Sequence, residues 1–188
     1  METKSIDSNS SNTKESNLSF KLINEVDCDE MINNFCCGNQ IIDNFLKNDS
    51  KDPDLSITYL LIDNDKTLVG FYSLICSSLL EVYKGKIVSS TPAIEIKMLA
   101  IDNKYQSLNI PNHNFTYAHL MLIHCIDKID EITKSIGAEY IVLNSTPEGY
   151  NLYTKVGNFD VIDEDYLLPD WKSDLDAIRM AKQIRPKL

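Results

Sequence analysis

The residues most able to do chemistry lie in one stretch, residues 96–125, which reads IKMLAIDNKYQSLNIPNHNFTYAHLMLIHC. An apolar, strand-like run passes through a polar segment into a run with helical apolar spacing. Strand–loop–helix junctions often bind phosphate groups, because free N–H groups at the start of a helix attract anions. Such loops usually contain glycine, which lets the backbone approach the ligand, yet no glycine lies between Tyr105 and Ala118. The segment is therefore either a rebuilt phosphate-binding loop or one that has been lost.

Two further pairs of side chains could move protons. Alternation along the strand predicts that Glu95 and Lys97 share a face with Leu99, and a nearby cation favours the charged form of a carboxylate. Glu95 is therefore either a general base or half of a solvated ion pair. Tyr150 and Tyr153 stand three residues apart on one helix face. A phenol can donate a proton at neutral pH, so Tyr153 is either a general acid or a side chain packed on the sheet.

Cysteine and histidine residues show no spacing that predicts a metal site. The five cysteines contain no CxxC pair, so reduced thiols are the default expectation. His119 and His124 are five residues apart and diverge around a helix. Cys36 and Cys37, beside Gly38, are interpreted as small buried hydrophobic side chains.

Composition places the chain among ordinary globular proteins. Its 188 residues suit one domain with a substantial core. A net charge of −10 argues against broad binding of nucleic-acid backbones, which requires clustered Lys and Arg. No apolar run approaches a membrane span, and the N-terminus has no apolar signal core. We expect a cytoplasmic protein without membrane contact, and the sequence leaves a homodimer open.

The elements that must position these residues form an α/β chain. Residues 1–17 are polar and predict a disordered tail, followed by a single domain over residues 18–188. The predicted strands are 18–23, two in a hairpin over 56–78, further strand near 79–88, and then 93–101, 139–144 and 158–162. The predicted helices are 28–35, 39–49, a long helix that ends at Gly137, 147–157 and a C-terminal helix over 173–184. This order predicts a mixed sheet with an antiparallel front half and a β-α-β unit behind it.

Three stretches together resemble the GNAT superfamily of N-acetyltransferases, most closely its branch of toxin–antitoxin acetyltransferases. They are FCCGNQIIDNFLKND, then LVGFYSL with IKMLAIDNKYQ, and finally NLYTKVGNF. The resemblance implies a central mixed sheet flanked by helices. It also implies transfer of an acetyl group from acetyl-CoA to a primary amine on a small-molecule or protein acceptor that the sequence does not identify.

The resemblance also implies roles for individual residues. In the superfamily the central strand separates from its neighbour, and its free N–H groups stabilise the negative charge that develops on the thioester oxygen. Tyr153 corresponds to the tyrosine that protonates the departing CoA thiolate, and Glu95 stands where some relatives place a general base. The predicted acetyl-CoA contacts are Leu99, Ala100, Ile101, Gln106, Asn114, Thr116, Tyr117 and Asn144.

The sequence departs from the superfamily pattern directly after Gln106. Relatives continue with Gly-x-Gly-x-Gly/Ala, whereas this chain has SLNIPNHNFTYA, which we interpret as an insertion of roughly eight residues over 107–114. Asn112 and Asn114 can adopt left-handed conformations in place of glycine, whereas Pro111 removes an N–H donor.

Three functions therefore stay open. The first is an active acetyltransferase with an altered pyrophosphate loop. The second is a GNAT-fold binding or regulatory protein that has lost acetyl-CoA. The third is a toxin-like enzyme that acetylates aminoacyl-tRNA, against which the net charge of −10 argues.

Overall fold

The computed structural model describes residues 18–64, 66–169 and 177–184. The helices are η1 (Ile23–Glu25), α1 (Asp29–Asn34), α2 (Gln40–Asn48), α3 (Tyr117–Thr133) and α4 (Tyr150–Lys155). The strands are β1 (Ser19–Leu22), β2 (Ile57–Ile62), β3 (Leu68–Tyr83), β4 (Lys86–Ile101), β5 (Tyr140–Ser145), β6 (Asp160–Val161), β7 (Tyr166–Leu167) and β8 (Ile178–Gln183). Within these ranges, no helix is long and apolar enough to cross a membrane.

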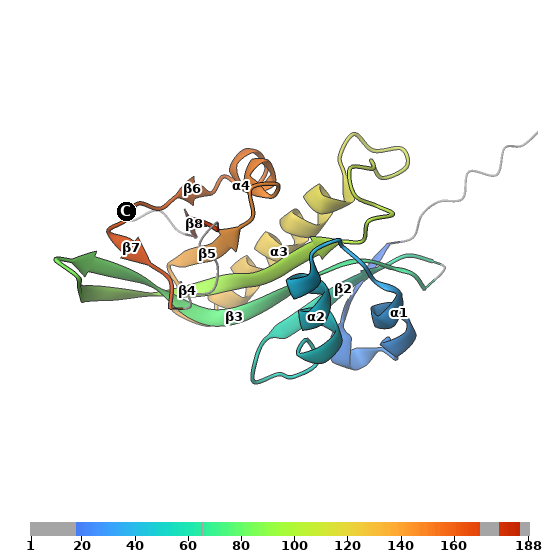
Figure 1. Ribbon diagram of the computed structural model, residues 1–188, viewed down its shortest axis with the longest axis horizontal. Helices are drawn as coiled ribbons and strands as arrows, with labels where there is room; N and C mark the ends of the chain where they lie inside the picture. The colour runs from blue at the N-terminus through green and yellow to red at the C-terminus, as the bar shows by residue number, and fades with distance from the viewer. Residues whose placement is uncertain (1–17, 65, 170–176, 185–188) are drawn as a thin grey trace, which may run out of the picture.

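The strands form one mixed sheet in the order β1-β2-β3-β4-β5-β8-β6, with β7 paired to β3. The β4–β5 pair is parallel and the other pairs are antiparallel. The helices α1 and α2 lie on one face and α3 on the other (Figure 1). This arrangement confirms the predicted mixed sheet flanked by helices.

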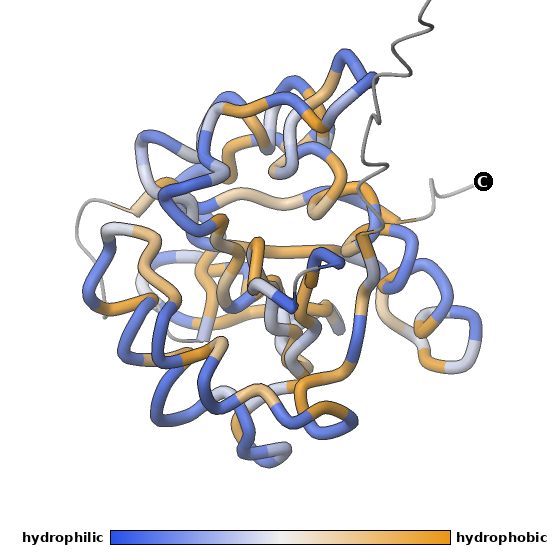
Figure 2. The backbone as a smooth tube through the Cα atoms, turned by 90° about the vertical axis from the view of Figure 1, so that its right-hand side faces the viewer, coloured by the Kyte–Doolittle hydropathy of each residue, from blue (hydrophilic) through white to orange (hydrophobic). Residues whose placement is uncertain are grey.

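Side-chain alternation along β3 builds a core on each face of the sheet. Phe71 packs with the α1 and α2 side chains, whereas its neighbour Tyr72 packs with Met121 and Cys125 of α3. Successive side chains on a strand point to opposite faces, so a buried strand between two helical layers must be apolar on both. In Figure 2 the hydrophobic stretches run through the middle of the molecule, and hydrophilic turns lie around them.

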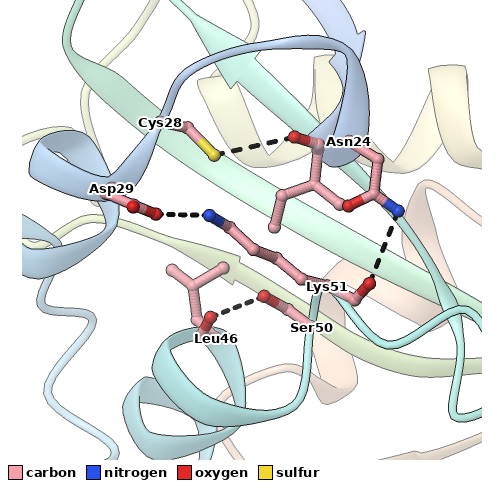
Figure 3. A network of polar contacts seen from close by, with 7 residues as sticks. Asn24, Cys28, Asp29, Leu46, Ser50 and Lys51 are labelled. Atoms are coloured by element: carbon pink, nitrogen blue, oxygen red, sulfur yellow. Dashed lines mark hydrogen bonds and ion pairs between the residues drawn. The ribbon is translucent and has the colours of Figure 1, made fainter.

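A polar network ties the α1 segment to the end of α2 (Figure 3). Lys51 forms an ion pair with Asp29 at the start of α1. The Asn24 side chain donates to the Lys51 carbonyl at 3.4 Å, and Ser50 Oγ donates to the Leu46 carbonyl at 2.5 Å. These contacts hold α1 and α2 together. The connection between the two helices lies beside the end of β4.

The strands β3 and β4 form one long hairpin, so the strand expected near residues 79–88 is the far end of this hairpin. Lys84 and Gly85 have φ of 52° and 73°, which is the geometry that a two-residue type I′ turn requires. Pro92 lies inside β4 just before its pairing with β5 begins at Ala93. The Pro92 carbonyl accepts a hydrogen bond from the Glu139 N–H at 2.9 Å, so it points away from β3. The nitrogen of a strand residue points to the same side as its carbonyl, so the missing N–H of proline removes no hydrogen bond between β3 and β4.

The prediction of a C-terminal helix over 173–184 was wrong for the described part of that range. Residues 178–183 are the strand β8, which pairs with both β5 and β6; residues 170–176 lie outside the described chain. Ala, Met, Arg and Lys favour helices, but without β8 the far edge of β5 would leave backbone groups unpaired. Met180 fills the core opposite Leu143 and is fully buried.

A bulge at Lys97 changes which side chains of β4 share a face. Ser73 pairs with Met98 and Leu74 with Ile96, so Lys97 has no partner on β3. Its Nζ lies 5.5 Å from the centre of the Phe45 ring on the α2 side, whereas Leu99 packs on the α3 side. The prediction that Glu95, Lys97 and Leu99 share one face was therefore wrong, because a bulge shifts the alternation by one residue.

Candidate active site

The parallel strands β4 and β5 separate part-way along their length. Their pairing runs only from Ala93 with Tyr140 to Ile96 with Leu143. Beyond that point β4 stays with β3 and β5 stays with β8. The bulge at Lys97 lies where the separation begins, and bulges bend a strand and increase its twist. The predicted separation of the central strand is confirmed.

Backbone groups of β4 face this gap. The Asp102 N–H donates to the carbonyl of Val69 in β3 at 2.9 Å. Alternate residues of an antiparallel strand bond to the same neighbouring strand. Leu99 and Ile101 therefore direct their N–H and C=O groups away from β3 and into the gap. Gln106 confirms this direction, because its Nε2 donates to the Ile101 carbonyl at 2.9 Å.

A cavity of about 930 Å³ occupies the gap. Its walls come from the end of β4 and the following turn, from the α1–α2 connection with the start of α2, from Ala118 of α3, and from the turn into α4. Because α2 and α3 cover opposite faces of the sheet, the cavity is lined from both faces. Its volume is that of a typical small-molecule site.

The turn after β4 is built around the buried carboxylate of Asp102, which is 3% exposed. Its Oδ2 accepts the Cys36 N–H and its Oδ1 accepts the Lys104 N–H, both at 3.0 Å. The Asn103 N–H returns a bond to the Cys36 carbonyl at 2.9 Å. Two motifs far apart in sequence, FCCG and DNKYQ, are thus joined in one wall of the cavity.

Gln106 strengthens the same junction. Its Nε2 donates to the carbonyls of Ile101 and Cys37 at 2.9 and 2.8 Å, so both amide hydrogens are used within the protein and only Oε1 is left for a ligand. Cys37 lines the cavity, and burial raises the pKa of its thiol to about 12. Cys36 is exposed and Cys37 half-buried, so the interpretation of both as buried side chains was wrong.

The segment interpreted as an insertion folds into a closed loop. Asn109 and Thr116 form an antiparallel bridge, and the Ile110 N–H donates to the Phe115 carbonyl at 3.1 Å. The His113 N–H donates to Ile110 at 3.0 Å. Ile110 is 4% exposed and belongs to the core on the α3 side. The loop over 107–116 is therefore anchored in the core rather than wrapped around an open anion site.

The left-handed positions of this loop were partly predicted. Asn112 has a φ of 65°, as expected, and Ser107 has a φ of 61°. Asn114 is not among the left-handed residues of the described chain. At the start of α3, Thr116 Oγ1 accepts the His119 N–H at 3.3 Å. One of the free N–H groups at this helix start is thus capped by the protein's own side chain.

Several solved structures are similar to this protein in fold. A structure described as a bacterial toxin superimposes with a TM-score of 0.70 at 19% identity, covering 90% of this chain and 92% of that one. The Tyr-to-Phe mutant of the AtaT toxin, bound to acetyl-CoA and the C-terminus of its antitoxin AtaR, gives 0.65 at 15% identity, with 89% and 93% covered. AtaT complexed with acetyl-methionyl-tRNAfMet gives 0.61 at 17% identity, with 81% and 94% covered. No protein-family model matches the sequence, and no curated protein matches it.

The chain has the GNAT fold. The site residues implied by the sequence divide into two groups in it. Leu99, Ala100, Ile101 and Gln106 line the cavity in the gap. The other six do not line it: Glu95, Asn114, Thr116, Tyr117, Asn144 and Tyr153. The structure thus brings together the residues from the end of β4 and the following turn, and leaves out the residues at the start of α3, on β5 and on α4.

The residues of the second group have structural contacts of their own. Tyr117 is buried, and its ring meets the edge of the Tyr105 ring at 5.2 Å between centroids. Thr116 caps α3. Asn144 is exposed and pairs with Arg179 across β5 and β8. Glu95 is 8% exposed and lies within the paired part of the GNAT central strand, before the gap opens.

Tyr153 lies immediately behind the cavity wall. It is 7% exposed, and a Cβ added to the cavity-lining Gly149 would lie 3.1 Å from Tyr153 Cε2. Its ring meets the Phe159 ring at 5.8 Å between centroids. Burial raises the pKa of its phenol, so the hydroxyl stays protonated.

Glu148 is the charged residue of the cavity that the sequence did not point to. Among the described residues it is the only Asp, Glu, Lys or Arg that lines the cavity. A usable signal was present, because ligands of open α/β sheets bind beyond the carboxyl ends of parallel strands. Glu148 and Gly149 follow the end of β5, whose neighbour β4 is parallel to it.

The acyl donor that the GNAT fold implies, acetyl-CoA, fits this cavity at one end. The gap offers an unpaired strand edge and apolar side chains such as Leu99 and Leu152 to the acetyl and pantetheine groups. The phosphate groups of CoA have no such counterpart. No described Lys or Arg lines the cavity, and Glu148 brings negative charge to it.

Proposed function

We propose that this protein is an N-acetyltransferase that moves an acetyl group from the thioester of acetyl-CoA to a primary amine. The separation of β4 and β5 carries this proposal, because it exposes the strand edge at Leu99 and Ile101 inside a cavity of sufficient size. An ordinary core strand would be paired along both edges at this position.

The chemistry follows from these backbone groups. The amine nitrogen attacks the thioester carbon, a C–N bond forms, and the C–S bond breaks. The carbonyl oxygen gains negative charge on the way, and the N–H groups of β4 that face the gap are placed to stabilise it. The amine loses one proton, and the departing sulfur gains one.

Tyr153 supplies the proton to the sulfur in this proposal. A phenol is protonated at neutral pH and can act as a general acid; burial raises the pKa of Tyr153 and so makes it a weaker acid than a free tyrosine. Its ring packs against Gly149, which lines the cavity. Glu95 is the proposed base that accepts the proton of the amine, through water, because it stands on β4 just before the gap.

The first test is binding of CoA followed by transfer. Ligand binding to the folded state raises its stability by RT ln(1 + [L]/Kd), so millimolar CoA should raise the melting temperature in differential scanning fluorimetry. Thiol release from acetyl-CoA in the presence of a panel of primary amines then measures transfer. Absence of any thermal shift would favour the alternative, a GNAT-fold binding protein that has lost acetyl-CoA.

A second candidate acceptor is the α-amino group of an aminoacyl-tRNA. The observation that favours it is the likeness in fold to AtaT, which was solved with acetyl-methionyl-tRNAfMet. The net charge of −10 opposes it. Incubation with methionyl-tRNA and labelled acetyl-CoA should label the RNA if this acceptor is right; unlabelled RNA alongside labelled small amines would rule it out.

A further inference from the structure

From the lining of this cavity we infer that the site recognises its donor through the acyl-pantetheine arm alone, and that its described residues form no binding site for the 3′-phospho-ADP part of CoA. The substrate class is then acyl-pantetheine thioesters, with or without a nucleotide. This inference rests on the proposed function. It names the donor class of the same site.

The first argument concerns charge. The nucleotide end of CoA carries a diphosphate and a 3′-phosphate, which proteins bind with Lys, Arg or clustered N–H groups. No described Lys or Arg lines the cavity, whose one carboxylate is Glu148. A like charge at the rim repels phosphate, so side-chain electrostatics oppose the nucleotide.

The second argument concerns the backbone. An anion nest needs successive free N–H groups, and in the turn directly after β4 the four N–H groups from Asn103 to Gln106 already donate within the protein. Hydrogen bonds are donated by the N–H groups of Asn103, Lys104, Tyr105, Gln106, Leu108 and Ile110. At the start of α3, the His119 N–H is taken by Thr116 Oγ1. The turn from Asn103 to Gln106 therefore offers no run of free N–H groups to a pyrophosphate.

The third argument concerns the opposite end of the donor. The strand edge at Leu99 faces the gap, and Leu152 and Ala118 add apolar surface. All bond changes occur here: the acyl C–S bond breaks, the C–N bond forms, and the thiol leaves with a proton. The nucleotide takes no part in these bond changes and contributes only to binding affinity. A site without groups that bind the nucleotide therefore does not discriminate between donors with and without it.

The test compares ligands on the full-length protein by isothermal titration calorimetry, using CoA, dephospho-CoA and pantetheine. We expect dissociation constants that agree within about tenfold, and a Kd for CoA that hardly changes between low and high salt. CoA binding more than about a hundredfold tighter than pantetheine would overturn the inference and leave the proposed function intact. Absence of binding by all three ligands would overturn the proposed function and this inference with it.

Reversing the charge of Glu148 tests the argument from charge directly. Glu148→Lys should tighten CoA binding up to about fivefold relative to pantetheine binding, because only CoA has phosphates for the new cation. Glu164→Lys is the matched control, with the same change of charge at an exposed residue that does not line the cavity; it should change neither constant. Equal effects of the two substitutions on CoA binding would show that Glu148 does not act on the phosphates, and would contradict the argument from charge.

Discussion

The gap between β4 and β5 and the loop over 107–116 border the same cavity. Different interactions hold the two regions in place. The gap depends on strand pairing: β4 stays with β3, β5 stays with β8, and the bulge at Lys97 lies where they part. The loop depends on its own short-range hydrogen bonds and on Ile110 in the core. The gap and the loop are therefore held in place by separate sets of interactions.

This difference has a physical cause. Strand pairing is shared among many residues of the sheet, so one substitution rarely closes the gap. The anion-binding geometry of a loop depends on a few backbone conformations, and residues other than glycine reach these at a cost. The following substitutions perturb the gap and the loop separately.

The largest expected effect is on the gap side. Tyr153→Phe keeps the ring against Phe159 and removes only the hydroxyl, so a general-acid role predicts a kcat lower by about a hundredfold or more. The donor Kd should change little. Thiol-release kinetics with calorimetry measure both quantities, and an unchanged kcat would assign Tyr153 to packing alone.

The next effect is on the loop side. Ile110→Ala removes a buried side chain from the core and should lower the free energy of unfolding by about 2–5 kcal/mol. Pantetheine binding should persist at temperatures where the variant is folded, because the loop does not form the strand edge. Urea unfolding gives the stability. A loss of pantetheine affinity in the folded variant would show that loop and gap are coupled.

A smaller effect is expected where β3 supports the end of β4. A Cβ on Gly70 would lie 2.6 Å from the Ala100 carbonyl and 2.5 Å from Met121 Cε, closer than such atoms pack. Gly70→Ala should therefore destabilise the fold by about 1–3 kcal/mol and weaken pantetheine binding. Gly137→Ala is a suitable control, since nothing lies near its Cβ position. Equal free energies of unfolding for Gly70→Ala and Gly137→Ala would contradict the close approach of the Gly70 backbone to Ala100 and Met121.

The smallest effect concerns the two adjacent thiols. Burial raises the pKa of Cys37 from 9.0 to about 12, and only the thiolate reacts readily. Iodoacetamide at pH 8 should therefore modify the exposed Cys36 first, as read by peptide mass spectrometry. Because the folded pKa is the higher one, Cys37 favours the folded state below pH 9, and this contribution is lost as the pH rises toward 12. Faster labelling of Cys37 would contradict its burial in the wall.

Much of the fold could be read from local pattern. Apolar alternation located β2, β3 and β4, and helical spacing located α2 and most of α3, since both signals report burial of one face. The left-handed Asn112 was also predicted, because asparagine tolerates that conformation. The β8 segment was misassigned because its residues favour a helix in isolation, and only the free edge of β5 makes it a strand.

The sequence by itself predicted the mixed sheet, indicated the GNAT resemblance, proposed Leu99, Ala100 and Ile101 as site residues, and showed the break in pattern after Gln106. The tertiary structure alone decided where β4 leaves β5, which face Lys97 takes, and how Asp102 and Gln106 join the turn to the FCCG motif. It also brought Glu148 to the cavity. These features depend on contacts between residues far apart in the chain, and periodicity within one segment carries no information about its distant partner.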